Sequence, residues 1–327
     1  MTTSDATKRL LVGGERGGRQ RGRTLLRPSP LRDRRAVLAM AGPGLILAVA
    51  LSIVVLTNAI WLILHYENLL SPRHQFIGAT NFKALVHDHT LRSSLVTTAI
   101  YVGVALPIEA VLGIGISLLI HYGVPGERLV RSLLIVPMVL APLIVGLLWR
   151  LLYDPSAGLL DYLLGQLGLG GKTAWLANPH TALWAVIASD VWEWTPFIII
   201  IALAALESLP REPLEAAEID GASALERIRY IVLPLIRPAL AIAVFLRLIG
   251  LLNSFPSIWA MTKGGPGTTT MTLNVYAYQQ GFELFAIGYA TTMCLLYGLL
   301  ITFGIMPLAR RLLGFAEEAK TIEVATI

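Results

Sequence analysis

Six long apolar stretches constrain the fold of this sequence more than any other feature. Each is close to the roughly 20 residues that an α-helix needs to cross the hydrocarbon core of a bilayer. The chain is 55% hydrophobic and 14% charged, whereas a soluble protein has about 25% charged residues. Helices satisfy their own backbone hydrogen bonds in lipid, and no β pattern competes with them here. We therefore expect an all-α integral membrane protein with six transmembrane helices, over residues 36–64, 93–120, 133–152, 181–206, 239–261 and 284–309.

Polar segments at the two ends flank this predicted membrane domain, residues 36–310. Residues 1–35 are rich in Arg and Gly and have little apolar content, which is typical of a disordered basic cytoplasmic tail. The tail is expected to meet anionic lipid rather than nucleic acid. Residues 311–327 are predicted to form a short cytoplasmic C-terminal tail.

The distribution of Lys and Arg predicts the orientation of the spans. With the N-terminus inside, the cytoplasmic segments hold 19 of the 26 Lys and Arg residues, and the outer segments hold 5. Cytoplasmic loops carry the excess of positive charge in membrane proteins. Both termini, and the polar loop at 207–238 between the fourth and fifth spans, are therefore expected in the cytoplasm.

The polar loop carries the most specific pattern in the chain, E-A-A-x-x-D-G-A followed by L-P-x-x-x-P. Two short helices are expected, over about 212–220 and 222–232, with Gly221 between them because glycine reaches left-handed backbone angles without steric cost. Asp220 is expected to cap the second helix, and Pro234 and Pro238 to end it. By itself, such a segment could also be an amphipathic loop that rests on lipid headgroups.

This pattern resembles the cytoplasmic coupling loop of the permease subunits of ATP-binding cassette importers. The resemblance implies the six-span fold of a type I importer and a loop that contacts the ATPase subunits. Ile228 departs from many members, which have an aromatic residue there. The matching and implied ATPase-coupling positions are Glu215, Ala216, Ala217, Asp220, Gly221, Ala222, Ile228, Leu233 and Pro234.

Several partners follow from the resemblance, which covers about residues 93–311. They are a second, similar permease, two ATP-binding subunits and an external substrate-binding protein, in the cytoplasmic membrane of a bacterium or archaeon. The chain has no G-x-x-x-x-G-K-[ST] phosphate loop, so ATP and Mg are expected on the partner ATPases and no cofactor on this chain. No metal-ligand spacing or catalytic arrangement is present, and the single Cys294 is expected to be a packing residue.

Ionisable residues inside the spans are costly, and each suggests a function. Helical spacing places Asp190, Glu193 and Trp194 on one face of the fourth span, with Trp192 at a flank. Aromatic rings beside hydrogen-bonding groups suit the recognition of a sugar. By position, the resemblance to maltose-type importers implies a substrate pathway of Asp190, Trp192, Glu193, Trp194, Arg247, Leu251, Asn253 and Ser254.

A structural role for the same charges is the alternative, because Asp190 or Glu193 could pair with Arg247 as a bridge between spans. Glu193, Trp194 and Arg247 also depart from the maltose-type residues, which argues against maltose itself as the substrate. Glu109, in the second span, has no assigned role.

The outer loops support the same interpretation. An amphipathic helix is expected over 159–169, on the outer surface. The turn-rich string TKGGPGTTT, within 262–282, resembles the sugar and glycerol-phosphate importer branch. The sequence therefore predicts a permease subunit for a sugar, oligosaccharide or polyol that has no enzymatic activity of its own.

Two other classes of protein remain as alternatives. An ion-coupled secondary transporter could use Asp190 and Glu193 as a proton relay, although such proteins commonly show paired internal repeats that are not visible here. An integral-membrane enzyme could use the same two residues as acid and base.

Overall fold

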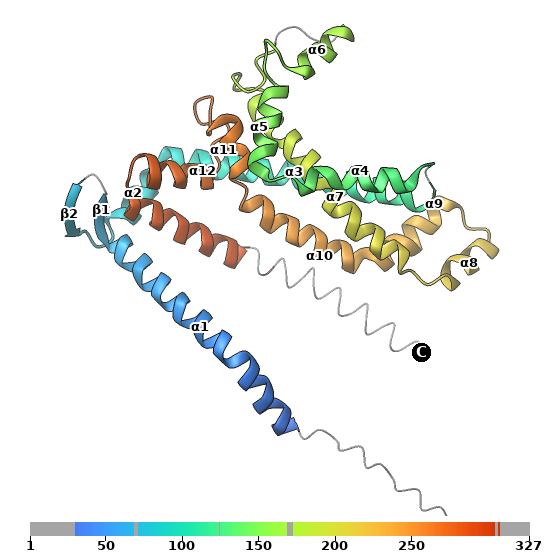
Figure 1. Ribbon diagram of the computed structural model, residues 1–327, viewed down its shortest axis with the longest axis horizontal. Helices are drawn as coiled ribbons and strands as arrows, with labels where there is room; N and C mark the ends of the chain where they lie inside the picture. Colours follow the sequence, from blue (N-terminus) through green and yellow to red (C-terminus); the bar gives the residue numbers. More distant parts are fainter. Residues whose placement is uncertain (1–29, 69–70, 124, 169–172, 305–306, 308–327) are drawn as a thin grey trace, which may run out of the picture. The chain divides into compact units, whose positions relative to one another are not determined.

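The computed structural model describes residues 30–68, 71–123, 125–168, 173–304 and 307, and most of them are helical (Figure 1). Five helices in this part of the chain are long and apolar enough to cross a membrane, and there are six if one bent pair counts as a single span. The helical character of the sequence prediction is thereby confirmed. The candidate spans are Met40–Leu64, His89–His121, Ala182–Glu207, Ala224–Leu252, Ile287–Gly304 and the pair Leu129–Val139 with Pro142–Leu152.

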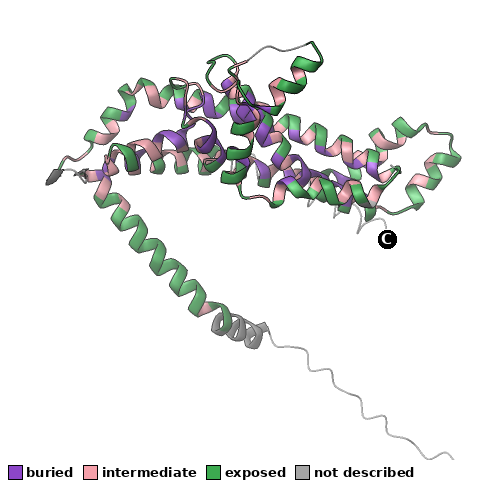
Figure 2. Cartoon of the chain, turned by 45° about the horizontal axis from the view of Figure 1, so that its top comes forward, coloured by how far each residue is buried: buried purple, intermediate pink, exposed green. Residues whose placement is uncertain are grey.

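The chain divides into two compact units at Thr57. The first unit contains most of helix α1 (Pro30–Leu64), whose apolar side chains from Met40 onward are largely exposed (Figure 2). Bare apolar side chains along a helix of this length are what lipid contact requires. The basic tail was predicted over residues 1–35, of which residues 1–29 lie outside the described residues. Residues 30–35 belong to α1, which corrects the prediction that they are disordered.

A small hairpin follows α1 and corrects the expectation that the chain has no β structure. Strand β1 (His65–Asn68) pairs antiparallel with β2 (Ser71–Phe76), with His65 opposite Phe76. The His65 ring stacks on Trp61, with 3.7 Å between the ring centroids, and meets Phe76 edge-on. The strands are too short to show an alternating pattern, so the sequence carries little signal for them.

Asp88 caps the N-terminal end of α3 (His89–His121), which follows α2 (Thr80–His87). One carboxylate oxygen accepts hydrogen bonds from the Thr90 and Leu91 backbone amides, at 2.8 and 3.0 Å, as an N-cap does. The other accepts from the hydroxyls of Tyr276, at 2.6 Å, and Tyr289. Burial alone would raise the pKa of Asp88, but these four hydrogen bonds hold it below its ordinary value of 3.8.

The predicted third span is broken, which corrects the single helix expected over 133–152. Helix α4 (Glu127–Val139) and helix α5 (Pro142–Leu152) meet at a bend of 100°. Leu140 and Ala141 between them are extended. The ring of Pro142 disfavours helical angles in the residue before it, so the helix cannot run through Ala141.

Close contacts between helices depend on glycines. Helix α7 (Ala182–Glu207) packs along α3 so closely that a Cβ on Gly113 would lie 2.6 Å from the Ile198 Cγ2 atom. Helix α5 packs on α11 (Pro256–Thr262) in the same way, because a Cβ on Gly146 would lie 2.6 Å from the Ser257 carbonyl oxygen. Buried residues concentrate where these helices meet (Figure 2).

The predicted fifth span begins earlier and ends earlier than expected. Helix α10 covers Leu233–Leu252, and residues 253–255 separate it from α11, which Pro256 begins. The prediction that Pro234 and Pro238 end the preceding helix is wrong. The π-helix η1 (Ile228–Val232) continues directly into α10, Pro234 lies in the first turn of α10, and Pro238 lies inside it.

Short helices in two loops and one further candidate span complete the described chain. Helix α6 (Leu159–Gln166) forms where an amphipathic helix was predicted over 159–169, of which residue 169 is outside the described residues. After the glycine-rich turn come α12 (Leu273–Tyr278), the π-helix η2 (Gln279–Glu283) and the last helix, Ile287–Gly304. Cys294 on that last helix is exposed, so it is not the intrachain packing residue that was expected.

Candidate functional site

The polar loop forms two short helices that project from the end of the spans (Figure 1). Helix α8 (Glu212–Ile219) and helix α9 (Ala224–Arg227) flank Gly221, whose φ of +79° confirms the predicted left-handed backbone. The Ala222 amide donates back to the Ala217 carbonyl at 2.9 Å, which closes the C-terminus of α8. Nothing lies within 4 Å of a Cβ added at Gly221, so inside this chain the position is open.

Ser223, and not Asp220, caps the second helix. The Ser223 hydroxyl accepts a hydrogen bond from the Glu226 amide, and the Ser223 amide donates to the Glu226 carboxylate at 2.8 Å. Asp220 is the C-terminal cap residue of α8 instead. The second helix starts two residues later than predicted, which places Asp220 too far away. The S-x-x-E capping box was legible in the sequence.

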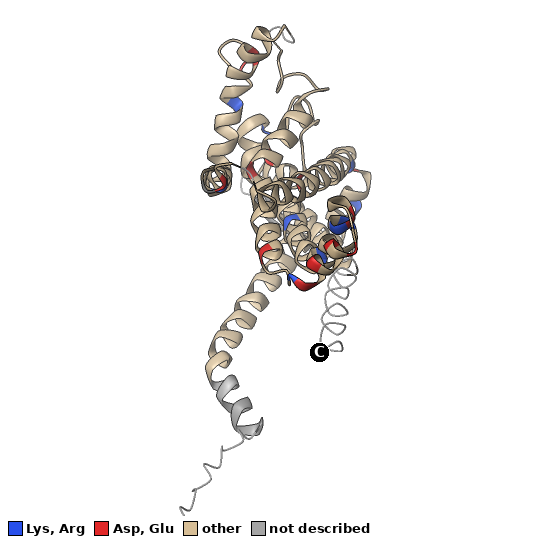
Figure 3. Ribbon diagram, turned by 90° about the vertical axis from the view of Figure 1, so that its right-hand side faces the viewer, with Lys and Arg blue, Asp and Glu red and all other residues tan. Residues whose placement is uncertain are grey.

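The loop exposes both charged and apolar side chains. Figure 3 looks onto the end formed by α8 and α9 and shows acidic and basic residues gathered there. Arg227 bridges to Glu218 at 2.7 Å and so ties the two helices together. Ile219, Leu225 and Tyr230 are 87%, 74% and 67% exposed. The predicted coupling residues 215–217, 220–222, 228, 233 and 234 are all exposed or half-buried.

A second cluster of predicted residues lies inside the helix bundle, around Arg247 of α10. The guanidinium donates two hydrogen bonds to the Glu109 carboxylate of α3, from Nε at 2.6 Å and from Nη2 at 2.8 Å. Nη2 also donates to Asp190 of α7. All three side chains are buried, with at most 4% of each residue exposed. One cation therefore joins three of the spans.

This bridge answers part of the alternative that the sequence left open. Asp190 does pair with Arg247, and Glu193 does not. The bidentate partner is Glu109, which sequence reasoning left without a role. A signal was available, because an ionisable residue in a span needs a partner or water. The choice among the possible partners depends on how α3 packs beside α10, which periodicity does not reveal.

Glu193 lies one helical turn after Asp190 and is 1% exposed. Neither of its carboxylate oxygens has a hydrogen-bond partner in the described part of the chain. A buried carboxyl group without a partner is costly and is uncommon in proteins unless it has a function. Its nearest charged neighbours are Asp190 and Arg247.

A cavity of about 460 Å³ opens beside Arg247. The Trp194 ring faces the guanidinium, with 5.0 Å between the Arg247 Cζ and the ring centroid. Ser254 accepts a hydrogen bond from the Tyr101 hydroxyl at 3.1 Å. Aromatic and small polar groups thus line the cavity together, and its full set of lining residues is Pro142, Trp194, Phe197, Leu246, Arg247, Gly250, Asn253, Ser254, Pro256 and Ser257.

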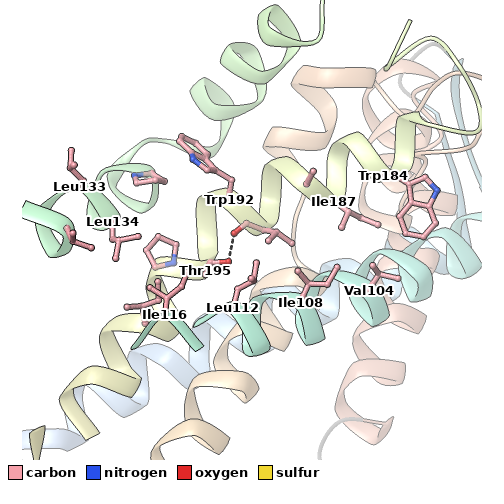
Figure 4. Close-up of a pocket in the computed structure, with 16 residues that line it drawn as sticks. Val104, Ile108, Leu112, Ile116, Leu133, Leu134, Trp184, Ile187, Trp192 and Thr195 are labelled. Carbon is pink, nitrogen blue, oxygen red and sulfur yellow. Dashed lines mark hydrogen bonds between the residues drawn. The ribbon is translucent and has the colours of Figure 1, made fainter. Parts of the chain in front are cut away.

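Four of the predicted pathway residues are not among those that line this cavity. Asp190 and Glu193 are buried in α7, and the other two lie elsewhere. Leu251 is 1% exposed and belongs to the apolar core. Trp192 points to the other side of α7, where its ring meets Trp149 edge-on at 5.6 Å. There it lines a separate apolar cavity of about 700 Å³ between α3, α4 and α7 (Figure 4).

Comparison with known proteins identifies the family. The family described as "Binding-protein-dependent transport system inner membrane component" matches residues 94–313. The chain belongs to this family. A relative from Sinorhizobium fredii, the probable ABC transporter permease protein y4oQ, is 41% identical over 72% of this chain and 76% of its own length.

Two further relatives carry names that include a substrate. The trehalose/maltose transport system permease protein MalF of Thermococcus litoralis is 32% identical over 76% of this chain and 85% of its own length. The sn-glycerol-3-phosphate transport system permease protein UgpA of Yersinia enterocolitica is 34% identical over 69% of this chain and 76% of its own length.

A solved structure shares the fold of these inner membrane components. A chain of a bacterial alginate ABC transporter, crystallised in complex with an alginate pentasaccharide-bound periplasmic protein, superposes with a TM-score of 0.74. The match covers 86% of this chain and 94% of the other at 22% sequence identity. This chain therefore shares its fold with that chain of the alginate transporter.

Proposed function

We propose that this chain is one permease half of an ATP-driven importer for a sugar, an oligosaccharide or a polyol. Its family is that of binding-protein-dependent transport. Relatives at 32% and 34% identity are named for trehalose/maltose and for glycerol phosphate, which supports a small polyhydroxylated substrate. An ion-coupled transporter has no need of an exposed coupling loop, and the family match disfavours that alternative.

The proposed topology has six spans, with α4 and α5 counted as one. In this topology both termini and the α8–α9 loop lie in the cytoplasm of a bacterial or archaeal cell, which the excess of Lys and Arg in these segments supports. The membrane domain then covers residues 36–310, with cytoplasmic tails on either side. The outer helix α6 faces the side from which a binding protein delivers substrate.

The proposed complex contains a second permease, two ATPase subunits that bind ATP and Mg, and an external binding protein. The observation that carries the proposal is the α8–α9 loop. It exposes Ile219 and Leu225 beside the acids of the E-A-A string, and Gly221 forms its tip with open space around it. Apolar side chains held out by a capped turn suit a socket on another protein. Closure of the ATPase dimer would move this loop and the spans that follow it.

The substrate pathway is proposed to run through the cavity beside Arg247. Trp194 supplies an aromatic face for the C–H groups of a sugar, and Asn253 and Ser254 supply hydrogen-bonding groups. Asp190 supports the site by holding Arg247 in position. Trp192 and Leu251, which the resemblance also implied, would contribute from outside this cavity.

Substitution of Gly221 tests the coupling role. We expect Gly221→Asp to leave the spans inserted, with about 1 kcal/mol of backbone strain, while it abolishes co-purification of the ATPase subunits or substrate-stimulated ATP turnover. Gly168→Asp is the matched control, because Gly168 also has a positive φ (+70°) and open surroundings but lies in the outer loop. Normal co-purification and turnover in Gly221→Asp would leave the loop as a segment that rests on lipid headgroups.

A further inference from the structure

The charges beside the cavity do not balance. Arg247 is the one Lys or Arg among the residues that line it. Three buried carboxyl groups surround this cation, from Glu109, Asp190 and Glu193. The formal sum is −2, and it stays negative if one carboxyl group holds a proton. The carboxyl groups therefore outnumber the cation, and among the described residues no unpaired Lys or Arg lines the cavity.

Arg247 has little positive charge left to offer an anion. Nε and Nη2 donate to Glu109, and Nη2 donates also to Asp190. Phosphate and carboxylate sites use the two-pronged face of an arginine, and in this chain Glu109 already occupies that face. The remaining nitrogen, Nη1, lies 3.2 Å from the position of a Cβ on Gly250, at the cavity wall. It can donate a hydrogen bond to a hydroxyl oxygen without pairing with a second anion.

Glu193 supplies the complementary group, an acceptor without a donor. Both of its oxygens are buried and unpartnered in the described chain. Glu193 itself is not among the residues that line the cavity, but Trp194, the next residue on α7, is. Hydroxyl groups are the donors that satisfy a carboxylate without adding charge. A sugar that stacks on Trp194 would bring such donors to this face of α7.

We infer that the half of the pathway formed by this chain accepts uncharged, polyhydroxylated substrates and rejects anionic ones, and that Glu193 is the residue that sets this preference. The inference rests on the proposed function, because it assumes that substrate passes the cavity beside Arg247. The names of the relatives do not decide the matter, since one names an uncharged sugar pair and another a phosphate ester.

Equilibrium binding to the permease–ATPase complex without its binding protein tests this, because the binding protein would otherwise impose its own selectivity. The uncharged probes are radiolabelled trehalose and maltose, and the anionic probes are glycerol 3-phosphate and glucuronate. The variants are Glu193→Gln and, as the matched control, Glu207→Gln. Glu207 is on the same helix, 52% exposed, and pairs with Arg131 at the far end of the span.

We expect the wild-type complex and Glu207→Gln to bind an uncharged probe and neither anion. Glu193→Gln should weaken the binding of the uncharged probes and raise the affinity for an anion by about tenfold. That factor is the effect of removing one unit charge about 10 Å from the anion at an effective dielectric constant of about 20. Wild-type binding of an anion as tight as that of the uncharged probes would overturn the inference, as would unchanged selectivity in Glu193→Gln or no binding of either uncharged probe.

ATP-dependent uptake by the complete complex separates this inference from the proposed function. Uptake of glycerol 3-phosphate or glucuronate but not of an uncharged sugar would retain the importer and refute the charge selectivity. Loss of ATP dependence for every probe would refute both.

Discussion

Removal of one partner from the Arg247 bridge should destabilise the helix bundle strongly. Arg247→Met leaves Glu109 and Asp190 buried without a cation, and breaking a buried pair from one side costs about 3–5 kcal/mol. Glu109→Gln leaves Arg247 its contact with Asp190 and removes the charge-assisted pair at 2.6 and 2.8 Å, which should cost about 1.5–3 kcal/mol. Both substitutions act on the same contact, so their effects should not add.

The assay is equilibrium unfolding of the purified permease in mixed micelles by titration with dodecyl sulfate, followed by tryptophan fluorescence. We expect the double variant to lose at least about 1 kcal/mol less than the sum of the single losses. Glu207→Gln is the control, since its bridge to Arg131 is half-exposed and solvent screening leaves such a pair with little effect on stability. Additive losses, or a stable Arg247→Met variant, would refute the bridge as a source of stability.

Three further predictions concern the cavity, the N-terminal end of α3 and the α5–α11 contact. Gly250→Ala should lower sugar uptake severalfold without loss of the complex, because its Cβ would come 3.2 Å from Arg247 Nη1. Gly298→Ala is the control and should have no effect, because nothing lies within 4 Å of a Cβ there. Equal uptake in both variants would contradict this prediction. The stability that Asp88 provides should be complete above pH 3.8 and be lost as the pH falls through its lowered pKa. In a plot of unfolding free energy against pH, Asp88→Asn should reduce the loss of stability at acid pH. An unchanged loss in that variant would contradict the role of Asp88 as the titrating group. Gly146→Ala should destabilise the protein by about 1–3 kcal/mol through overpacking against α11, measured by thermal unfolding, and a neutral effect would show that the helices can separate.

Local features of this chain were predictable from the sequence. The apolar stretches gave the helices because their length and lack of charge leave few other structures in lipid. Gly221 required a positive φ because two helices meet there with almost no connecting residues, and the structure has it. The family also followed from a local string, the E-A-A motif of the same loop.

Features that depend on packing or on a single peptide unit were missed. The bend at Pro142 is set by the angles of the residue before it, which a hydropathy window averages away. The pairing of Glu109 with Arg247 joins residues 138 positions apart and requires the packing of α3 on α10. Ser223 was missed for a different reason, since Asp220 offered a competing and equally local capping signal.

ATP-dependent uptake into proteoliposomes tests the central claim most directly. The permease is reconstituted with its partner permease, the ATPase subunits and the binding protein, and uptake of radiolabelled trehalose and maltose is followed with ATP on the ATPase side. The account predicts that uptake of at least one sugar requires ATP, the ATPase subunits and the binding protein together. Uptake by the permease alone, driven by a proton gradient and abolished by Glu193→Gln, would contradict it and identify an ion-coupled transporter.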